Sequence, residues 1–172
     1  MKKIALISFL LFGLFSCQTS NTLPELQDLN NDVQAQAKDS KEKSRFGTAK
    51  RDIFFAQSTA RRWDTSAELV KIEGYWISET GDSNWVYYFK SPFKNTAYKV
   101  ENMFGQEYPN SFFGSRFDEY NVRVDSDKAI QKAKTQGLKN FPVSRMTLEN
   151  RFGRLEWEIQ SSNGVFRISA DF

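Results

Sequence analysis

The stretch Ser126–Phe172, SDKAIQKAKTQGLKNFPVSRMTLENRFGRLEWEIQSSNGVFRISADF, decides the predicted fold. Small apolar residues recur at helical spacing after Ser126, and Gly137 is typical of the C-terminal end of a helix. Apolar and polar residues then alternate in three runs, with turn residues at Gly153 and Gly164 between them. Neither a helix stripe nor one sheet face is stable alone, so the stretch predicts one helix packed on three strands.

Residues 48–103 repeat this order of elements. A helical period comes first, and three strand-like runs follow it. Gly81 and Trp85 are four residues apart, as are Gly153 and Trp157, and this spacing is no general requirement of such folds. We therefore favour internal duplication over a chance likeness of two helix-and-strand runs. The predicted fold is α+β, with two repeats of one helix packed on a three-stranded antiparallel sheet, and both tryptophans in the core.

The N-terminus predicts the cellular localisation of the protein. Lys2 and Lys3 precede an apolar run, Ile4–Phe15, that is too short for a membrane span of about 20 residues. Leu14-Phe15-Ser16-Cys17 follows and resembles the lipobox of bacterial lipoproteins. The resemblance implies cleavage before Cys17 and acylation of its sulfur. The alternative is an ordinary secretory signal with an incidental cysteine, but Cys17 is the one cysteine of the chain, and lipidation accounts for it.

The sequence thus divides into five parts. We expect a signal peptide at 1–16, a lipid anchor and polar tether at 17–47, the first repeat at 48–103, a connecting segment at 104–125 and the second repeat at 126–172. Gln18 after the cysteine implies, by the same resemblance, the outer membrane of the bacterial envelope, facing the periplasm.

Composition limits the function classes. The net charge is +3 and falls to +1 without Lys2 and Lys3, which argues against a nucleic-acid partner. Histidine is absent, which removes the usual general base and transition-metal ligand. Glu73 and Glu149 fall on predicted solvent faces, where acids are ordinary, and the same alternation places Val70 with Ile72 and Trp76 on one side of a strand. We predict neither an enzyme nor a bound cofactor or metal.

The connecting segment is the best candidate for function. It mixes aromatic residues with Gly, Pro, Asn and Ser and has no clean helical or strand period. Such a segment is typical of an interaction surface, although its rings could instead cover the outer face of the first sheet. The predicted partner-binding residues are Phe104, Tyr108, Phe112, Phe113 and Phe117.

The repeated pattern resembles the PepSY-like group of bacterial envelope domains. The resemblance rests on Ala129 and Ala133 in the helix, on Val143–Glu149 in the first strand and on Gly164–Ile168 near the end. It implies no cofactor and a role in binding or restraining another envelope protein. The alternatives are an accessory lipoprotein of outer-membrane assembly, similar in layout to BamE-type proteins, and a carrier of a hydrophobic ligand.

Overall fold

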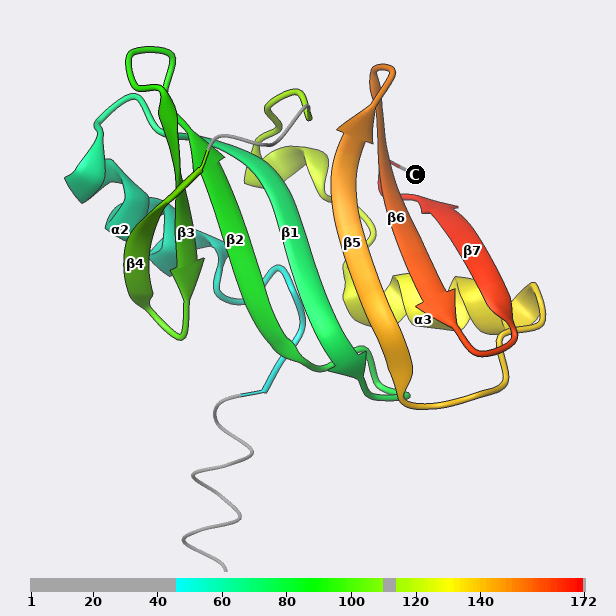
Figure 1. Cartoon of the computed structure of the whole chain (residues 1–172). Helices are drawn as coiled ribbons and strands as arrows, with labels where there is room; N and C mark the ends of the chain where they lie inside the picture. The colour runs from blue at the N-terminus through cyan, green and yellow to red at the C-terminus, as the bar shows by residue number, and fades with distance from the viewer. Residues whose placement is uncertain (1–45, 110–113, 172) are drawn as a thin grey trace, which may run out of the picture. The chain divides into compact units, whose positions relative to one another are not determined.

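The computed structural model describes residues 46–109 and 114–171, all within the structural unit Asp39–Phe172. In these residues one antiparallel sheet of seven strands runs in the order β4-β3-β2-β1-β5-β6-β7 (Figure 1). The strands are β1 (Glu68–Ile77), β2 (Asn84–Lys90), β3 (Thr96–Glu101), β4 (Phe104–Pro109), β5 (Val143–Arg151), β6 (Arg154–Ser161) and β7 (Gly164–Ser169). The helices are α2 (Ile53–Trp63), α3 (Ser126–Thr135) and the short 3-10 helix η1 (Glu119–Asn121).

The prediction of two repeats of one helix packed on a three-stranded antiparallel sheet is wrong, because the domain is built on one seven-stranded sheet. The first strand of one half pairs with the first strand of the other, with Ile72 opposite Leu148 and Gly74 opposite Met146. These two strands would otherwise each expose a row of unpaired backbone groups. Pairing β1 with β5 satisfies both rows and makes one sheet of the whole domain.

Strand β4 is a further departure from the sequence prediction. Phe104–Pro109 has no alternating period, yet it pairs along its whole length with β3, from Glu101 opposite Phe104 to Thr96 opposite Pro109. Asn102 and Met103 both have positive φ, at 49° and 67°, and form the two-residue turn between the strands. Paired positive φ values suit the twist of a hairpin, so the turn sets β4 beside β3 despite its composition.

Both helices pack on the same face of the sheet, α2 over β2 to β4 and α3 over β6 and β7 (Figure 1). Each helix buries a narrow stripe in which two alanines let it lie close to the strands. The buried positions are Ile53, Ala56 and Ala60 in α2 and Ser126, Ala129, Ile130 and Ala133 in α3. These positions confirm the helical periods predicted in both halves of the sequence.

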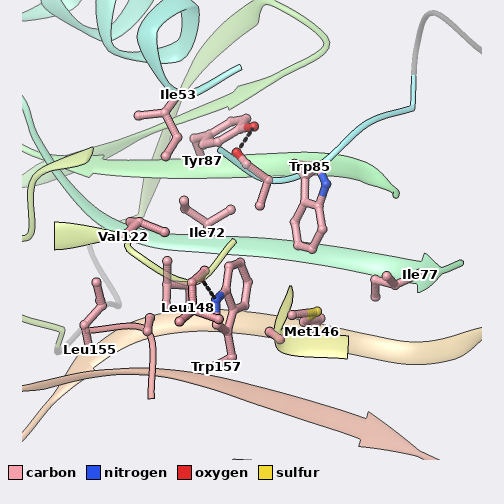
Figure 2. Close-up of a cluster of buried hydrophobic side chains, with 14 of the residues drawn as sticks. Ile53, Ile72, Ile77, Trp85, Tyr87, Val122, Met146, Leu148, Leu155 and Trp157 are labelled. Carbon is pink, nitrogen blue, oxygen red and sulfur yellow. Dashed lines mark hydrogen bonds between the residues drawn. The ribbon is translucent and has the colours of Figure 1, made fainter. Parts of the chain in front are cut away.

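The two predicted core tryptophans are confirmed and meet beneath the helices (Figure 2). The rings of Trp85 and Trp157 lie edge to face with centroids 5.7 Å apart. Each indole N–H donates to a backbone carbonyl just before a helix: Trp85 to Gly47 at 2.6 Å and Trp157 to Val124 at 2.8 Å. The tryptophans therefore fix the entry to both helices while filling the core.

The start of β1 does not follow a simple alternation. The register shifts between Leu69 and Lys71, and Val70 consequently lies on the sheet face opposite to Ile72. Trp76 has φ of 55° and is exposed, whereas Ile77 is buried. The expectation that Val70, Ile72 and Trp76 share one side is therefore wrong, because a bulge and a positive φ each reset the alternation.

Candidate functional site

The face of the sheet opposite the helices carries the candidate site. Lys71, Glu73 and Tyr75 project from β1 on this face, because Ile72 and its neighbours face the helices. In the paired strand β5, Glu149 lies opposite Lys71 and Arg145 lies opposite Tyr75. Two polar rows from the joined halves thus run side by side across the centre of the sheet.

These rows form one wall of a groove of about 970 Å³. Tyr88 from β2 and Tyr108 from β4 add aromatic surface, and their rings meet edge to face at 5.9 Å. Other described residues that line the groove are Val70, Gly114, Ser115, Asn150, Arg151, Phe152 and Gly153. The groove therefore combines aromatic rings with both signs of charge.

Glu73 is the buried centre of this face, with only 2 % of its surface exposed. Its Oε1 accepts from the Tyr75 hydroxyl at 2.9 Å and from the Arg145 guanidinium. Its Oε2 accepts from the Tyr88 hydroxyl at 3.2 Å and lies 3.0 Å from Lys71 Nζ. Four donors from three strands surround one carboxylate, so the charge is paired and its lone pairs are used. The expectation that Glu73 lies on a solvent face is wrong.

The protonation states follow from this arrangement. Burial pushes the pKa of Glu73 upward, but the hydrogen bond and charge of Lys71, helped by Tyr75 and Arg145, outweigh burial and lower that pKa. Burial first, and then the adjacent Glu73 carboxylate, raise the pKa of the Tyr75 and Tyr88 hydroxyls. Around neutral pH the carboxylate is charged and both tyrosines keep their protons as donors.

Alternating charges continue across the strands beyond Glu73. Lys71 Nζ lies 3.9 Å from Glu149, and Arg151 bridges Glu149 at 3.3 Å to Glu158 of β6 at 2.6 Å. Arg167 of β7 reaches the same Glu158 at 3.4 Å. Each of these charges lies within ion-pair distance of an opposite charge, and three of the four pairs join neighbouring strands.

The end of the groove is built where β1 and β5 separate. Ser115 forms a bridge with Asn150, and the Phe117 amide donates to the Leu69 carbonyl at 2.9 Å. The buried Asn150 Oδ1 has no hydrogen-bond partner among the residues that the structure describes. Phe152 lies at the adjacent β5–β6 turn with φ of 54° and is fully exposed.

No family model, curated protein or solved structure matches this chain. The likenesses to PepSY-like and BamE-type proteins therefore stay predictions, and the site is interpreted from its own residues. Within residues 46–109 and 114–171, no helix is long and apolar enough to cross a membrane, and no group of His, Cys, Asp and Glu is placed to hold a metal ion.

The structure distributes the predicted partner-binding residues over different surroundings. Tyr108 lines the groove, whereas Phe104 is exposed on β4 away from it. Phe117 is 6 % exposed and belongs to the core, so its ring is not accessible to a partner. Phe112, Phe113 and the predicted lipidation site Cys17 lie outside the described residues. The connecting segment thus contributes to the groove through Tyr108, Gly114 and Ser115.

Sequence reasoning missed the charged centre of the site. The signal was present as alternating polar residues in two strands, Lys71-x-Glu73-x-Tyr75 and Arg145-x-Thr147-x-Glu149. Each run alone is typical of a solvent face. They form a site only because β1 and β5 are neighbours, and that pairing joins residues 66 to 78 positions apart in sequence.

Proposed function

We propose that this chain is a lipoprotein of the bacterial cell envelope, anchored through Cys17 in the outer membrane, that binds another envelope protein without catalysis. The groove on the open face of the sheet is the proposed binding site. The observation that carries the proposal is the Glu73 network, because it holds Lys71, Tyr75 and Arg145 in fixed positions within a groove. Side chains fixed in this way lose little entropy when a partner binds.

The composition of the groove supports a polypeptide partner. Tyrosine and arginine are the residue types that contribute most often to protein interfaces. Tyr75 is exposed, and the centre of its ring lies 6.0 Å from Cζ of the Arg145 guanidinium. Phe152 is fully exposed at the end of the groove. A segment carrying apolar and charged side chains would find complementary groups along one continuous surface.

The test is site-specific photocrosslinking in cells. A photoreactive residue replaces Phe152 beside the groove or, as a matched control at another exposed position, Val165 on edge strand β7. We expect the photoreactive residue at position 152 to crosslink one protein. The same residue at position 165 should not crosslink that protein, and Tyr75→Ser should abolish the crosslink from position 152. Truncating a hot-spot residue weakens binding by about 30-fold or more, and tyrosine is one of the residue types enriched at hot spots.

Two results would contradict the proposal. One is the same set of crosslinks from both positions, and the other is an unchanged crosslink in Tyr75→Ser when circular dichroism confirms folding. A crosslink to the outer-membrane barrel assembly machinery would support binding and favour the accessory role similar to BamE-type proteins.

A further inference from the structure

The outward face of α2 is unusual for a surface helix. Ile53, Ala56 and Ala60 face the sheet, whereas the opposite side exposes 64 % of Phe54 and 50 % of Phe55. Arg61 follows Phe54 by seven residues, and Arg62 follows Phe55 by seven. Residues seven apart lie two turns along the same side of a helix, so two large rings and two guanidinium groups share one surface.

The turn between β3 and β4 extends this surface. A cleft of about 420 Å³ lies between α2 and this turn, with Phe55 on the helix side and Met103 and Phe104 on the turn side. Met103 is 63 % and Phe104 82 % exposed, and Met103 occupies a positive-φ position that normally favours Gly or Asn. We name Phe54, Phe55, Arg61, Arg62 and the Met103–Phe104 turn together the α2 surface.

The charge of the α2 surface has one sign. Helix α2 contains no acidic residue from Ile53 to Trp63. The acids at its ends are engaged, Asp52 with Arg51 and Asp64 with Ser66 and Ser91. The exposed Glu107 of β4 accepts from the Trp63 indole at 2.7 Å. In the part of the chain that the structure describes, Arg61 and Arg62 have no ion-pair partner.

The position of the chain entry supplies a second argument. The described chain begins at Phe46, whose carbonyl accepts from Arg51 Nη1 at 2.9 Å. Arg51 lines the same cleft as Phe55 and Met103, so the chain enters the domain beside the α2 surface. Cys17 lies 29 positions before Phe46. A chain of that length spans at most roughly 100 Å, whatever its conformation.

We propose that the α2 surface docks on the anionic phospholipid surface of the membrane to which the chain is anchored. Helices in a membrane interface bind through apolar rings at the boundary with the acyl chains and through basic residues that attract anionic lipids, and the exposed side of α2 carries both kinds of residue. Phe54 and Phe55 enter the boundary between headgroups and acyl chains, and Arg61 and Arg62 bind lipid phosphates. This inference rests on the proposed anchoring for its location. It adds an orientation, because α2 and the groove lie on opposite faces of the sheet and docking leaves the groove facing away from lipid.

The experiment separates the surface from the anchor. The mature chain, residues 17–172, is made with Cys17→Ser, which leaves it without any cysteine. Ser58→Cys, between the phenylalanines and the arginines, or the control Ser169→Cys on β7 then carries one environment-sensitive fluorophore. The labelled proteins are titrated with vesicles of phosphatidylcholine alone or with 30 % phosphatidylglycerol, a composition chosen for the assay.

We expect a blue shift from position 58 with anionic vesicles and none from position 169. Arg61→Gln with Arg62→Gln should weaken binding about 30-fold, since each lost charge weakens attraction to an anionic surface about fivefold. Phe54→Ser with Phe55→Ser should also weaken it, while Phe93→Ser, which removes an exposed ring on the β2–β3 connection, should leave binding unchanged.

Several outcomes would overturn the inference. The first is no binding to anionic vesicles, and the second is an equal fluorescence shift at positions 58 and 169. The third is a loss of binding in Phe93→Ser as large as the loss in Phe54→Ser with Phe55→Ser. Sedimentation that shows self-association lost in Phe54→Ser with Phe55→Ser would assign the α2 surface to a second copy instead. None of these outcomes bears on the groove, which the crosslinking experiment tests independently.

Discussion

Glu73→Gln is the substitution that most directly tests the interpretation of the site. Gln has almost the same shape and can still accept a hydrogen bond, but it removes the negative charge between Lys71 and Arg145. Removing one partner of a buried ion pair generally costs about 3–5 kcal/mol, because the other charge stays desolvated. The Arg145 side chain is 36 % exposed and Lys71 keeps Glu149 at 3.9 Å, so both cations retain part of their stabilisation. We therefore expect a loss of about 2–3 kcal/mol in the free energy of unfolding.

Urea denaturation of the mature Cys17→Ser chain measures this loss. The midpoint should fall while the slope with denaturant stays the same, since the surface exposed on unfolding hardly changes. Glu79→Gln is the matched control, because Glu79 is an exposed acid paired with Lys134 at 2.7 Å. An exposed pair of this kind contributes about 0–1 kcal/mol, so the control should lose no more than that.

The same measurement can refute the reasoning. A loss below about 0.5 kcal/mol in Glu73→Gln would mean that the network contributes no more than a surface ion pair. A double-mutant cycle with Arg145→Gln adds a direct measure of the contact. Residues in direct contact should show a coupling energy of about 0.5–3 kcal/mol, and an additive result would show that the two side chains act independently.

Two further predictions follow from particular contacts. Gly74→Ala should destabilise the domain by about 1–3 kcal/mol in urea denaturation, because a Cβ at this position would lie 2.7 Å from the Trp85 ring. Val165→Ala, at an exposed position of β7, is the control and should change the free energy of unfolding little. Equal losses in the two variants would contradict the packing argument. Acid should also destabilise the protein. The pKa values of Glu73 and Glu158 are lowered on folding, so the unfolded chain binds more protons at low pH, and the stabilisation present above about pH 5 is lost as pH falls through the folded pKa values. Thermal unfolding from pH 7 to pH 3 should show a smaller decrease in Glu73→Gln than in the parent chain.

Local patterns predicted the local structure well. The buried apolar stripes of both helices, the start of α3 near Ser126 and the burial of Trp85 and Trp157 all follow from the spacing of apolar residues. These features depend on contacts within one element or on burial alone. A single sequence contains that information because the period of the side chains sets which of them face the core.

Features that depend on tertiary pairing were not predictable in the same way. β4 contains Gly105 and Pro109, which are poor strand formers, and it becomes a strand through the turn at Asn102–Met103 and the register with β3. The bulge after Leu69 likewise has no clear local signal and moves Val70 to the other face. Tertiary context decides both cases over intrinsic preference.

The candidate site depends on the same tertiary pairing. If β1 and β5 were edges of separate sheets, Glu73 would be solvated, as an acid on a strand surface usually is. Their pairing places Thr147 opposite Glu73 and brings Arg145 to its carboxylate, while Tyr88 arrives from β2. The cost of burying the charge is then offset by donors from three strands, and the side chains that it holds form the groove. The residues of the α2 surface all come from one half, but both halves share one hydrophobic core, and Ser126 Oγ of the second half accepts from the Ala49 amide at 3.0 Å just before α2. The two proposed binding surfaces lie on opposite faces of the sheet, so substitutions at exposed positions can test them separately: Tyr75→Ser should weaken binding in the groove and leave vesicle binding unchanged, and Arg61→Gln with Arg62→Gln should do the reverse.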